Sequence, residues 1–241
     1  MKNFLARTWK FSKRLFLVLF ISQFAYIIIL KWMNPPVTLT QLGSFISGNG
    51  LKRDYVSADK ISPNAGLAVI ASEDQLFPDH NGFDWKSIQK AIEKNKKKRN
   101  RIAGASSISQ QVAKNVFLWQ GRNWLRKGLE IYFTFMIEWI WGKERILEVY
   151  LNVIEMGKGI FGIEAAARYY FAKTAAQLSK REAAMIASSL PNPTRYTVKP
   201  LSRFVAARYP WVITQMNNLD GDDDIKKILP GKKNKKDLPP Q

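Results

Sequence analysis

Residues 71–84, A-S-E-D-Q-L-F-P-D-H-N-G-F-D, directly follow the apolar run G-L-A-V-I-A. The run predicts a buried helix, with Glu73 and Asp74 at its end. Adjacent carboxylates are rarely left in such a place without partners, because an unpaired buried charge is costly. His80, the chain's only histidine, follows in the same stretch. We expect it to fix the turn before Asn81 and Gly82, and a catalytic role is the disfavoured alternative. The stretch therefore marks both a core helix and a candidate site.

Four capping patterns predict where helices begin. They are Ser62 before Pro63, Asp84 before Trp85, Ser107 with Gln110, and Ser179 with Glu182. In each, a side-chain oxygen can accept from backbone N–H groups that have no partner inside the helix. No convincing series of alternating strands occurs, so the sequence predicts a mainly α-helical domain.

Composition narrows the class of protein. The 241 residues suffice for one sizeable domain with appendages. The chain contains no cysteine, which excludes disulfides and thiol chemistry. Its 38 Lys and Arg against 19 Asp and Glu attract polyanions. On this basis nucleic acid, anionic lipid and phosphorylated substrates all remain possible binding partners.

The N-terminal segment predicts a membrane anchor. Leu15–Leu30 is 16 residues without a charge, near the lower limit for crossing a bilayer. Several cations precede this segment, whereas only Lys31 follows it closely; the preceding ones are Lys2, Arg7, Lys10, Lys13 and Arg14. By the positive-inside rule, the N-terminus is cytoplasmic and the domain is periplasmic or extracellular. We therefore expect a single-pass protein of the inner, cytoplasmic membrane.

A cleaved signal peptide is the competing interpretation of this segment. It is disfavoured because no small-x-small site follows the apolar run, only K-W-M-N-P-P. An exported domain meets little nucleic acid, so a nucleic-acid partner is not expected. The positive charge is expected to face the anionic membrane surface or a phosphorylated lipid.

Changes in composition suggest four regions. We expect a basic segment and anchor over 1–36, a Gly- and Ser-rich connector over 37–60, the main domain over 61–225, and a basic disordered tail over 226–241. A further basic run, 93–101, is typical of a solvated loop, and contact with anionic head groups is the alternative interpretation.

The predicted helix over 124–141 is apolar almost all the way round. Its polar exceptions recur every four residues and form one stripe, Arg126, Glu130, Thr134 and Glu138. Such a helix is either deeply buried or partly in lipid. Its carboxylates then need a cationic partner or have a raised pKa. Arg126 and Lys127 are the local candidates for the cationic partner of Glu130. For Glu138 we favour a structural ion pair.

Five segments occur in an order that is typical of one family. They are 73–84, G-A-S-S-I-S-Q-Q-V-A-K-N at 104–115, R-K-G-L-E at 126–130, K-E-R-I-L-E-V-Y-L-N at 143–152, and G-I-F-G-I-E-A-A-A-R-Y-Y-F at 159–171. Together they resemble the motifs of the peptidoglycan glycosyltransferases, glycosyltransferase family 51, over about residues 60–200. One departure is Ala105, where the family commonly has Gly, and we expect it to stiffen that loop; Ser107 keeps the hydroxyl.

The resemblance implies a lysozyme-like helical fold. It also implies polymerisation of lipid II into β-1,4 glycan strands with release of undecaprenyl pyrophosphate. Such a reaction needs a base for the acceptor hydroxyl and cations for the departing diphosphate. By resemblance Glu73 is the base, and burial at a helix end would raise its pKa toward the working pH. Glu130 would orient the donor and help to hold the cations.

The resemblance also suggests the remaining contacts. Lys114, Arg126 and Lys127 are expected at the diphosphate, with neutral hydrogen bonds from Ser106, Gln110 and Gln111. Asp74 is either a structural acceptor or a direct participant. A divalent cation, Mg²⁺ or Mn²⁺, is expected at the diphosphate only weakly, since the sequence has no dedicated metal cage. Expected partners are lipid II, the growing strand, the anionic membrane surface and other cell-wall synthesis proteins.

Two other functions remain open at this point. A lysozyme-like enzyme that cleaves glycan would share the fold and the paired carboxylates, and an anchored non-enzymatic scaffold would share the basic surface. A transpeptidase domain is not expected, because the Ser-x-x-Lys patterns at 57–60 and 87–90 are followed by no Lys-Thr-Gly. The match is to the monofunctional members of the family.

Overall fold

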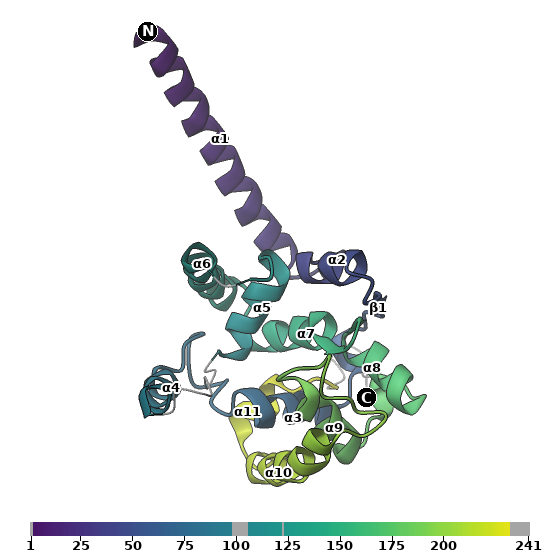
Figure 1. Cartoon of the computed structure of the whole chain (residues 1–241). Coiled ribbons are helices and arrows are strands. Elements are labelled where there is room, and N and C mark those ends of the chain that lie inside the picture. Colours follow the sequence, from purple (N-terminus) through teal and green to yellow (C-terminus); the bar gives the residue numbers. More distant parts are fainter. Residues whose placement is uncertain (1, 98–105, 122, 232–241) are drawn as a thin grey trace, which may run out of the picture. The chain divides into compact units, whose positions relative to one another are not determined.

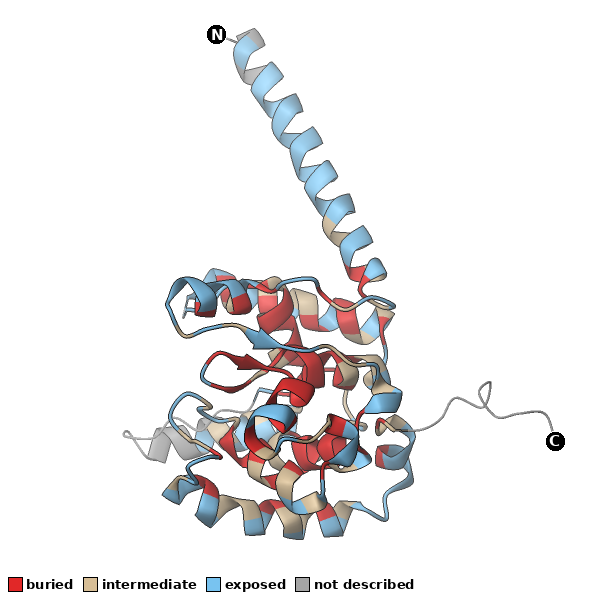
Figure 2. Ribbon diagram, turned by 90° about the vertical axis from the view of Figure 1, so that its right-hand side faces the viewer, coloured by how far each residue is buried: buried red, intermediate tan, exposed pale blue. Residues whose placement is uncertain are grey.

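A computed structural model describes residues 2–97, 106–121 and 123–231, and the chain divides into two units, Met1–Asn34 and Pro35–Gln241. The first unit contains α1 (Lys2–Ile29). Within it Arg7–Ile29 is a candidate membrane span of 23 residues, and most of its side chains are exposed (Figure 2). The expectation of one N-terminal helix long and apolar enough to cross a membrane is confirmed.

The second unit is mainly helical, as predicted (Figure 1). Its α-helices are α2 (Leu39–Ile46), α3 (Pro63–Glu73), α4 (Trp85–Lys97), α5 (Ile108–Phe117), α6 (Trp124–Ile140), α7 (Lys143–Val153), α8 (Ile163–Phe171), α9 (Lys180–Ser189), α10 (Arg203–Leu219) and α11 (Asp223–Ile228). Short 3-10 turns lie at η1 (Ala58–Lys60) and η2 (Ala175–Gln177). The strands are β1 (Lys52–Arg53), β2 (Glu155–Gly157) and β3 (Ile160–Phe161), in the order β1-β3-β2. β3 runs parallel to β1 and antiparallel to β2.

The predicted helix starts are confirmed. Ser62 accepts from the N–H of Asn64, and Asp84 accepts from the N–H of Ser87 at 2.9 Å. The capping boxes of Ser107 with Gln110 and of Ser179 with Glu182 each contain both reciprocal hydrogen bonds. Each satisfies N–H groups that a helix end leaves open. Local sequence chemistry therefore sets where α3, α4, α5 and α9 begin.

The second unit contains two groups of helices, and α3 of one group contacts α7 of the other (Figure 1). On one side α3 packs with α9 and α10, and on the other α5 packs with α2, α6 and α7. The predicted burial of the apolar run in α3 is confirmed, since Ala65–Ala71 is buried throughout. Because α3 ends at Glu73 inside this packing, the carboxylates that follow the run are held between the two groups.

The segments expected to be a connector and a tail have more order than those terms imply. Residues 37–60 contain α2, with a capping box of Thr38 and Gln41, as well as β1 of the sheet. At the other end Pro230 lies so close to Gly66 that an added Cβ would come within 2.6 Å of its ring. The N–H of Gly231 donates to the carbonyl of Ala58 at 2.9 Å. Residues 232–241 lie outside the described part of the chain, as do residues 98–101 of the basic run.

Helix α6 turns its polar stripe inward. Arg126, Glu130 and Thr134 are buried. Large apolar residues of the same helix are exposed, with Trp124 at 91% and Trp139 at 70%. A helix on the surface of a soluble protein has the opposite arrangement. The outer face of α6 is therefore apolar, and in the described residues nothing covers it.

Candidate active site

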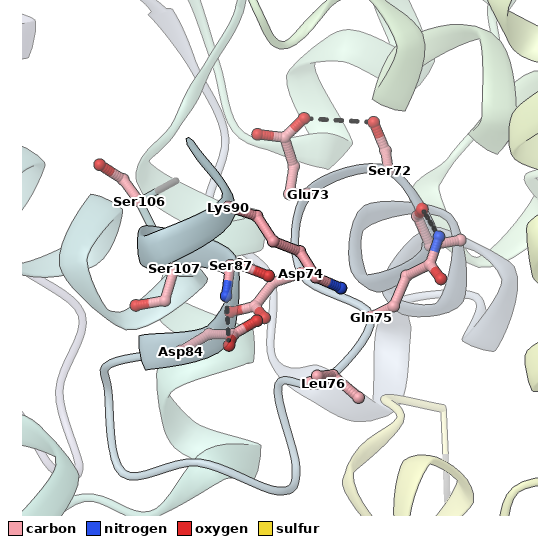
Figure 3. Close-up of a pocket in the computed structure, with 11 residues that line it drawn as sticks. Ser72, Glu73, Asp74, Gln75, Leu76, Asp84, Ser87, Lys90, Ser106 and Ser107 are labelled. Carbon is pink, nitrogen blue, oxygen red and sulfur yellow. Dashed lines mark hydrogen bonds between the residues drawn. The ribbon is translucent and has the colours of Figure 1, made fainter. Parts of the chain in front are cut away.

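Glu73 lies at the C-terminal end of α3 and lines a pocket of about 500 Å³. Asp84, Ser87 and Lys90 from the start of α4 line the same pocket, together with Ser106 ahead of α5 (Figure 3). The pocket is therefore built from the stretch that follows α3 and from the beginning of the second motif. Its hydroxyl, amine and carboxylate groups suit a polar ligand such as a sugar.

The Glu73 carboxylate is held by neutral donors. The Ser72 hydroxyl lies 3.1 Å from one carboxylate oxygen (Figure 3), and the Gln111 amide nitrogen donates to the other at 3.1 Å. The charge of Arg208 acts on this carboxylate from a guanidinium that donates to the carbonyl and the hydroxyl of Ser72. Burial raises the pKa of Glu73 and outweighs the lowering by Gln111, Ser72 and Arg208, while the charge of Asp74 adds to the rise. A carboxylate in this setting is suited to take up a proton.

Asp74 and His80 form a structural link. Asp74 accepts from the N–H of Ile108 at 3.0 Å, at the start of α5, and contacts Nε2 of His80 at 3.0 Å. The other ring nitrogen of His80 accepts from the N–H of Gly82 at 3.1 Å, so the expected role of His80 in this turn is confirmed. This acceptor role places the ring proton on Nε2, facing Asp74. Asp74 thus joins the end of α3 to the start of α5.

The turn that follows His80 requires glycine. Gly82 has φ +86°, and an added Cβ would come within 2.6 Å of Thr134 on α6. Its carbonyl accepts from the Ser107 hydroxyl at 2.5 Å. Glycine alone permits this backbone and this close approach. The first motif is thereby fixed against both α5 and α6.

A second pocket of about 460 Å³ lies on the other side of Gln111. Lys114 and Asn115 of α5, Thr40 and Ser44 of α2, and Glu155 of β2 contribute to its lining. Gln111 lines this pocket while it donates to Glu73, which lines the first. The carboxylate and its amide partner therefore stand between the two pockets.

Cations gather beside this second pocket. Arg126 contacts Glu130 at 2.7 Å, and Lys127 contacts the other oxygen of the same carboxylate, so the expected partners of Glu130 are confirmed. Lys114 has no carboxylate partner among the described residues; burial lowers its pKa, Glu130 raises it, and Arg126 and Lys127 lower it. Three cations thus lie within the electrostatic influence of one carboxylate, which contacts two of them. The surplus of positive charge in a partly desolvated place suits a diphosphate.

Glu138 belongs to a separate ion pair, as expected. Its partner is Lys143 at 2.6 Å, and Ser109 also contacts the same oxygen. Lys143 further donates to the carbonyl of His80. Burial lowers the pKa of Lys143, against the raising effect of Glu138. This pair stabilises the turn behind the site rather than the site itself.

The remaining predicted residues fall in different places. Ser106 lines the first pocket. The Gln110 amide oxygen accepts from the N–H of Ser107 in the capping box, and Gln110 is buried. Ala105, which we expected to stiffen its loop, lies outside the described part of the chain, and so does Gly104. Sequence reasoning assigned nothing to Ser72, Tyr150 or Arg208; only Tyr150 lies in one of the five segments.

The described residues near the cations form no cage of their own for a divalent ion. Over residues 2–97, 106–121 and 123–231, no group of three His, Cys, Asp or Glu side chains could hold a metal. Glu130 already directs one oxygen to Arg126 and the other to Lys127. A divalent ion at this place, Mg²⁺ or Mn²⁺, would need oxygens of the bound diphosphate among its ligands.

Comparison with known proteins gives matches to one family model and to relatives of one description. Residues 39–217 match the family model described as Transglycosylase. A biosynthetic peptidoglycan transglycosylase of Yersinia pseudotuberculosis serotype O:3 (strain YPIII) is 47% identical over 224 residues, which is 90% of this chain and 93% of that protein. A protein of the same name from Shigella boydii serotype 4 (strain Sb227) is 53% identical over 185 residues, or 76% of each chain.

Proposed function

This chain belongs to the transglycosylase family and is a peptidoglycan transglycosylase, a glycosyltransferase; we propose that it joins lipid II units into β-1,4 glycan strands. The observation that carries this proposal is the position of Glu73. It lies between two pockets and is held by neutral donors, with the cations on the far side of Gln111. A base on one side and cations on the other meet the two needs of transfer from a diphosphate donor.

The proposed step begins at Glu73. Its carboxylate takes the proton from the 4-hydroxyl of the N-acetylglucosamine of the acceptor. The hydroxyl oxygen attacks C1 of the N-acetylmuramic acid of the donor, and the bond from C1 to the phosphate oxygen breaks. The electron pair leaves with undecaprenyl pyrophosphate, the proton remains on Glu73, and the α linkage becomes β. The diphosphate is a weak base, so this step needs no general acid.

The cations act on the departing diphosphate. Lys114 is the member of the cluster that lines the second pocket and has no carboxylate partner among the described residues. Arg126 and Lys127 keep their positive charge close to it through Glu130. Because these groups are fixed before the reaction, they stabilise the charge that develops on the leaving oxygen without reorganisation. In this proposal Glu130 orients the cations.

The reaction is tested with lipid II and the purified full-length chain in detergent. We expect release of undecaprenyl pyrophosphate together with growing glycan. Shortening of preformed glycan in place of growth would contradict synthesis and favour a lysozyme-like enzyme. Binding of lipid II with no turnover by folded protein would favour a scaffold.

We further propose that α1 anchors the chain in the cytoplasmic membrane with its N-terminus inside and the second unit outside. Its candidate span has 23 residues. In this placement the apolar outer face of α6 contacts membrane lipid, because a lipid-linked substrate is bound at the membrane surface. Trp124 and Trp139, both widely exposed, are suited to the interface.

Fluorescence tests this placement of α6 in vesicles that contain brominated lipid. We expect the Trp139→Phe substitution to remove part of the quenchable emission, because Trp139 is 70% exposed on the outer face. The matched control is Trp141→Phe, which should leave quenching unchanged because Trp141 is 6% exposed and packs beside Phe117. Equal quenching in the Trp139→Phe variant and the unmodified chain would refute contact between α6 and lipid.

A further inference from the structure

The Gln111 side chain contacts a different group at each end of its amide. Its nitrogen lies 3.1 Å from a carboxylate oxygen of Glu73, and its oxygen lies 3.2 Å from the hydroxyl of Tyr150. An ionised carboxylate only accepts hydrogen bonds, whereas a tyrosine hydroxyl can donate one. The hydroxyl could also accept from a reversed amide, but its own buried proton would then lose the only acceptor that it contacts among the described residues. Both partners therefore favour the orientation in which the amide nitrogen faces Glu73.

Tyr150 is well suited to hold this orientation. It lies on α7 and is completely buried, at 0% exposure. Burial raises its pKa well above the ordinary value, and the charges of Glu73 and Asp74 raise it further. The hydroxyl thus keeps its proton over the whole range in which an enzyme is assayed. A phenylalanine would fill the same space but would leave the Gln111 oxygen without this donor.

A reversed amide would act on the base in the opposite direction. With its oxygen toward Glu73, Gln111 would repel the carboxylate instead of stabilising it. The Gln111 nitrogen is one of the groups that lower the pKa of Glu73 against the larger effect of burial. Loss of that donor would raise the pKa of Glu73 further, so the base would be protonated at a higher pH.

We propose that Tyr150 is a positioning residue for the base: it acts through Gln111, whose amide it holds with the nitrogen toward Glu73. This inference deepens the proposed function and rests on it for its catalytic meaning. The contact chain runs from α7 through α5 to the end of α3, so it crosses the junction between the two groups of helices.

The test is the Tyr150→Phe substitution, read by the pH dependence of kcat/KM on lipid II. We expect the acidic limb of the profile to move up by roughly half a pH unit or more, since a hydrogen bond to an ionised group is at stake. The rate near the foot of that limb should fall about threefold, while the plateau above it should be largely kept. The matched control is Tyr170→Phe, a buried tyrosine whose hydroxyl donates to the carbonyl of Met156 at 3.1 Å, outside the site.

A second measurement does not depend on turnover. Titration of the ¹³C-labelled Glu73 carboxyl by NMR, assigned with Glu73→Gln, should give the same upward shift in Tyr150→Phe. In a Gln111→Met background, Tyr150→Phe should add no further shift. An unchanged carboxyl titration, or an equal shift in Tyr170→Phe, would overturn the proposal. A shifted titration in a protein that makes no glycan would instead support the contact chain and count against the proposed function.

Discussion

Replacement of Glu73 by Gln is expected to lower the rate of glycan synthesis by about 10²–10⁴-fold, the usual contribution of a general base. The amide has nearly the shape of the carboxylate and can still contact Ser72 and Gln111, yet it cannot take up the acceptor proton. Pocket shape and substrate binding should therefore change little. The measurement is the initial rate of lipid II consumption by folded protein, with lipid II affinity determined in parallel.

The same substitution should raise stability at neutral and alkaline pH. The pKa of Glu73 is raised in the folded protein, so the folded state binds the proton more tightly than the unfolded state does. Stability is therefore lost as the pH rises from the unfolded pKa through the folded one. Gln is neutral at every pH. The melting temperature of Glu73→Gln should exceed that of the unmodified chain at pH 8, and the difference should disappear near pH 4.

The matched control for Glu73 is Glu144→Gln, an exposed carboxylate on α7. It should change neither the rate nor the pH dependence of melting. Equal polymerase activity in Glu73→Gln and the unmodified enzyme would remove Glu73 from the mechanism. A lower melting temperature of Glu73→Gln at pH 8 would show that the folded protein stabilises the charge and does not desolvate it.

The sequence predicted the parts of this site that depend on short-range chemistry. The end of α3 at Glu73 follows from one apolar run, and the contact of Arg126 with Glu130 follows from helical spacing. Capping patterns likewise located the start of α5, and with it Gln111 and Lys114. In each of these cases, residues close in sequence determine the structure.

Contacts between distant elements were beyond such reasoning. Arg208 reaches Ser72 across 136 positions, and Tyr150 reaches Gln111 across 39. No spacing rule links such residues, because only the packing of α10 on α3 and of α7 on α5 brings them together. The inward direction of the α6 stripe is a further case. A stripe of polar residues defines a face, but only the tertiary fold decides whether that face lies inside.

Glu130→Gln is expected to reduce both activity and stability. Glu130 is 3% exposed, and it is the only carboxylate partner of Arg126 and Lys127 among the described residues. Removal of one member of a buried ion pair typically costs roughly 3–5 kcal/mol, because the remaining charge is left uncompensated. The protein should therefore melt at a lower temperature. Glutamine keeps the shape of the side chain, so we expect the fold itself to persist.

The loss of activity should have a distinctive pH dependence. Burial lowers the pKa of Lys114, and Glu130 is the group that raises it. Without the Glu130 charge, the pKa of Lys114 falls further, and the ammonium loses its proton at a lower pH. We expect a rate reduced by about 10² or more per folded molecule, comparable to the loss of a group that stabilises developing charge. The alkaline limb of the pH profile should also move down.

The appropriate control for Glu130 is a buried carboxylate paired at the same spacing but outside the site. Glu164 contacts Arg168 at 2.7 Å with i,i+4 spacing, and it also accepts from the N–H of Ala175. Glu164→Gln should lower the melting temperature but leave the rate per folded molecule and the alkaline limb unchanged. If Glu130→Gln behaved in the same way, its role would be structural. A reduced rate and a shifted alkaline limb in Glu130→Gln, but not in Glu164→Gln, would show that the charge of Glu130 acts in the reaction. It would do so through Lys114, because Glu130 raises the pKa of that ammonium group, which faces the leaving diphosphate in the proposed step.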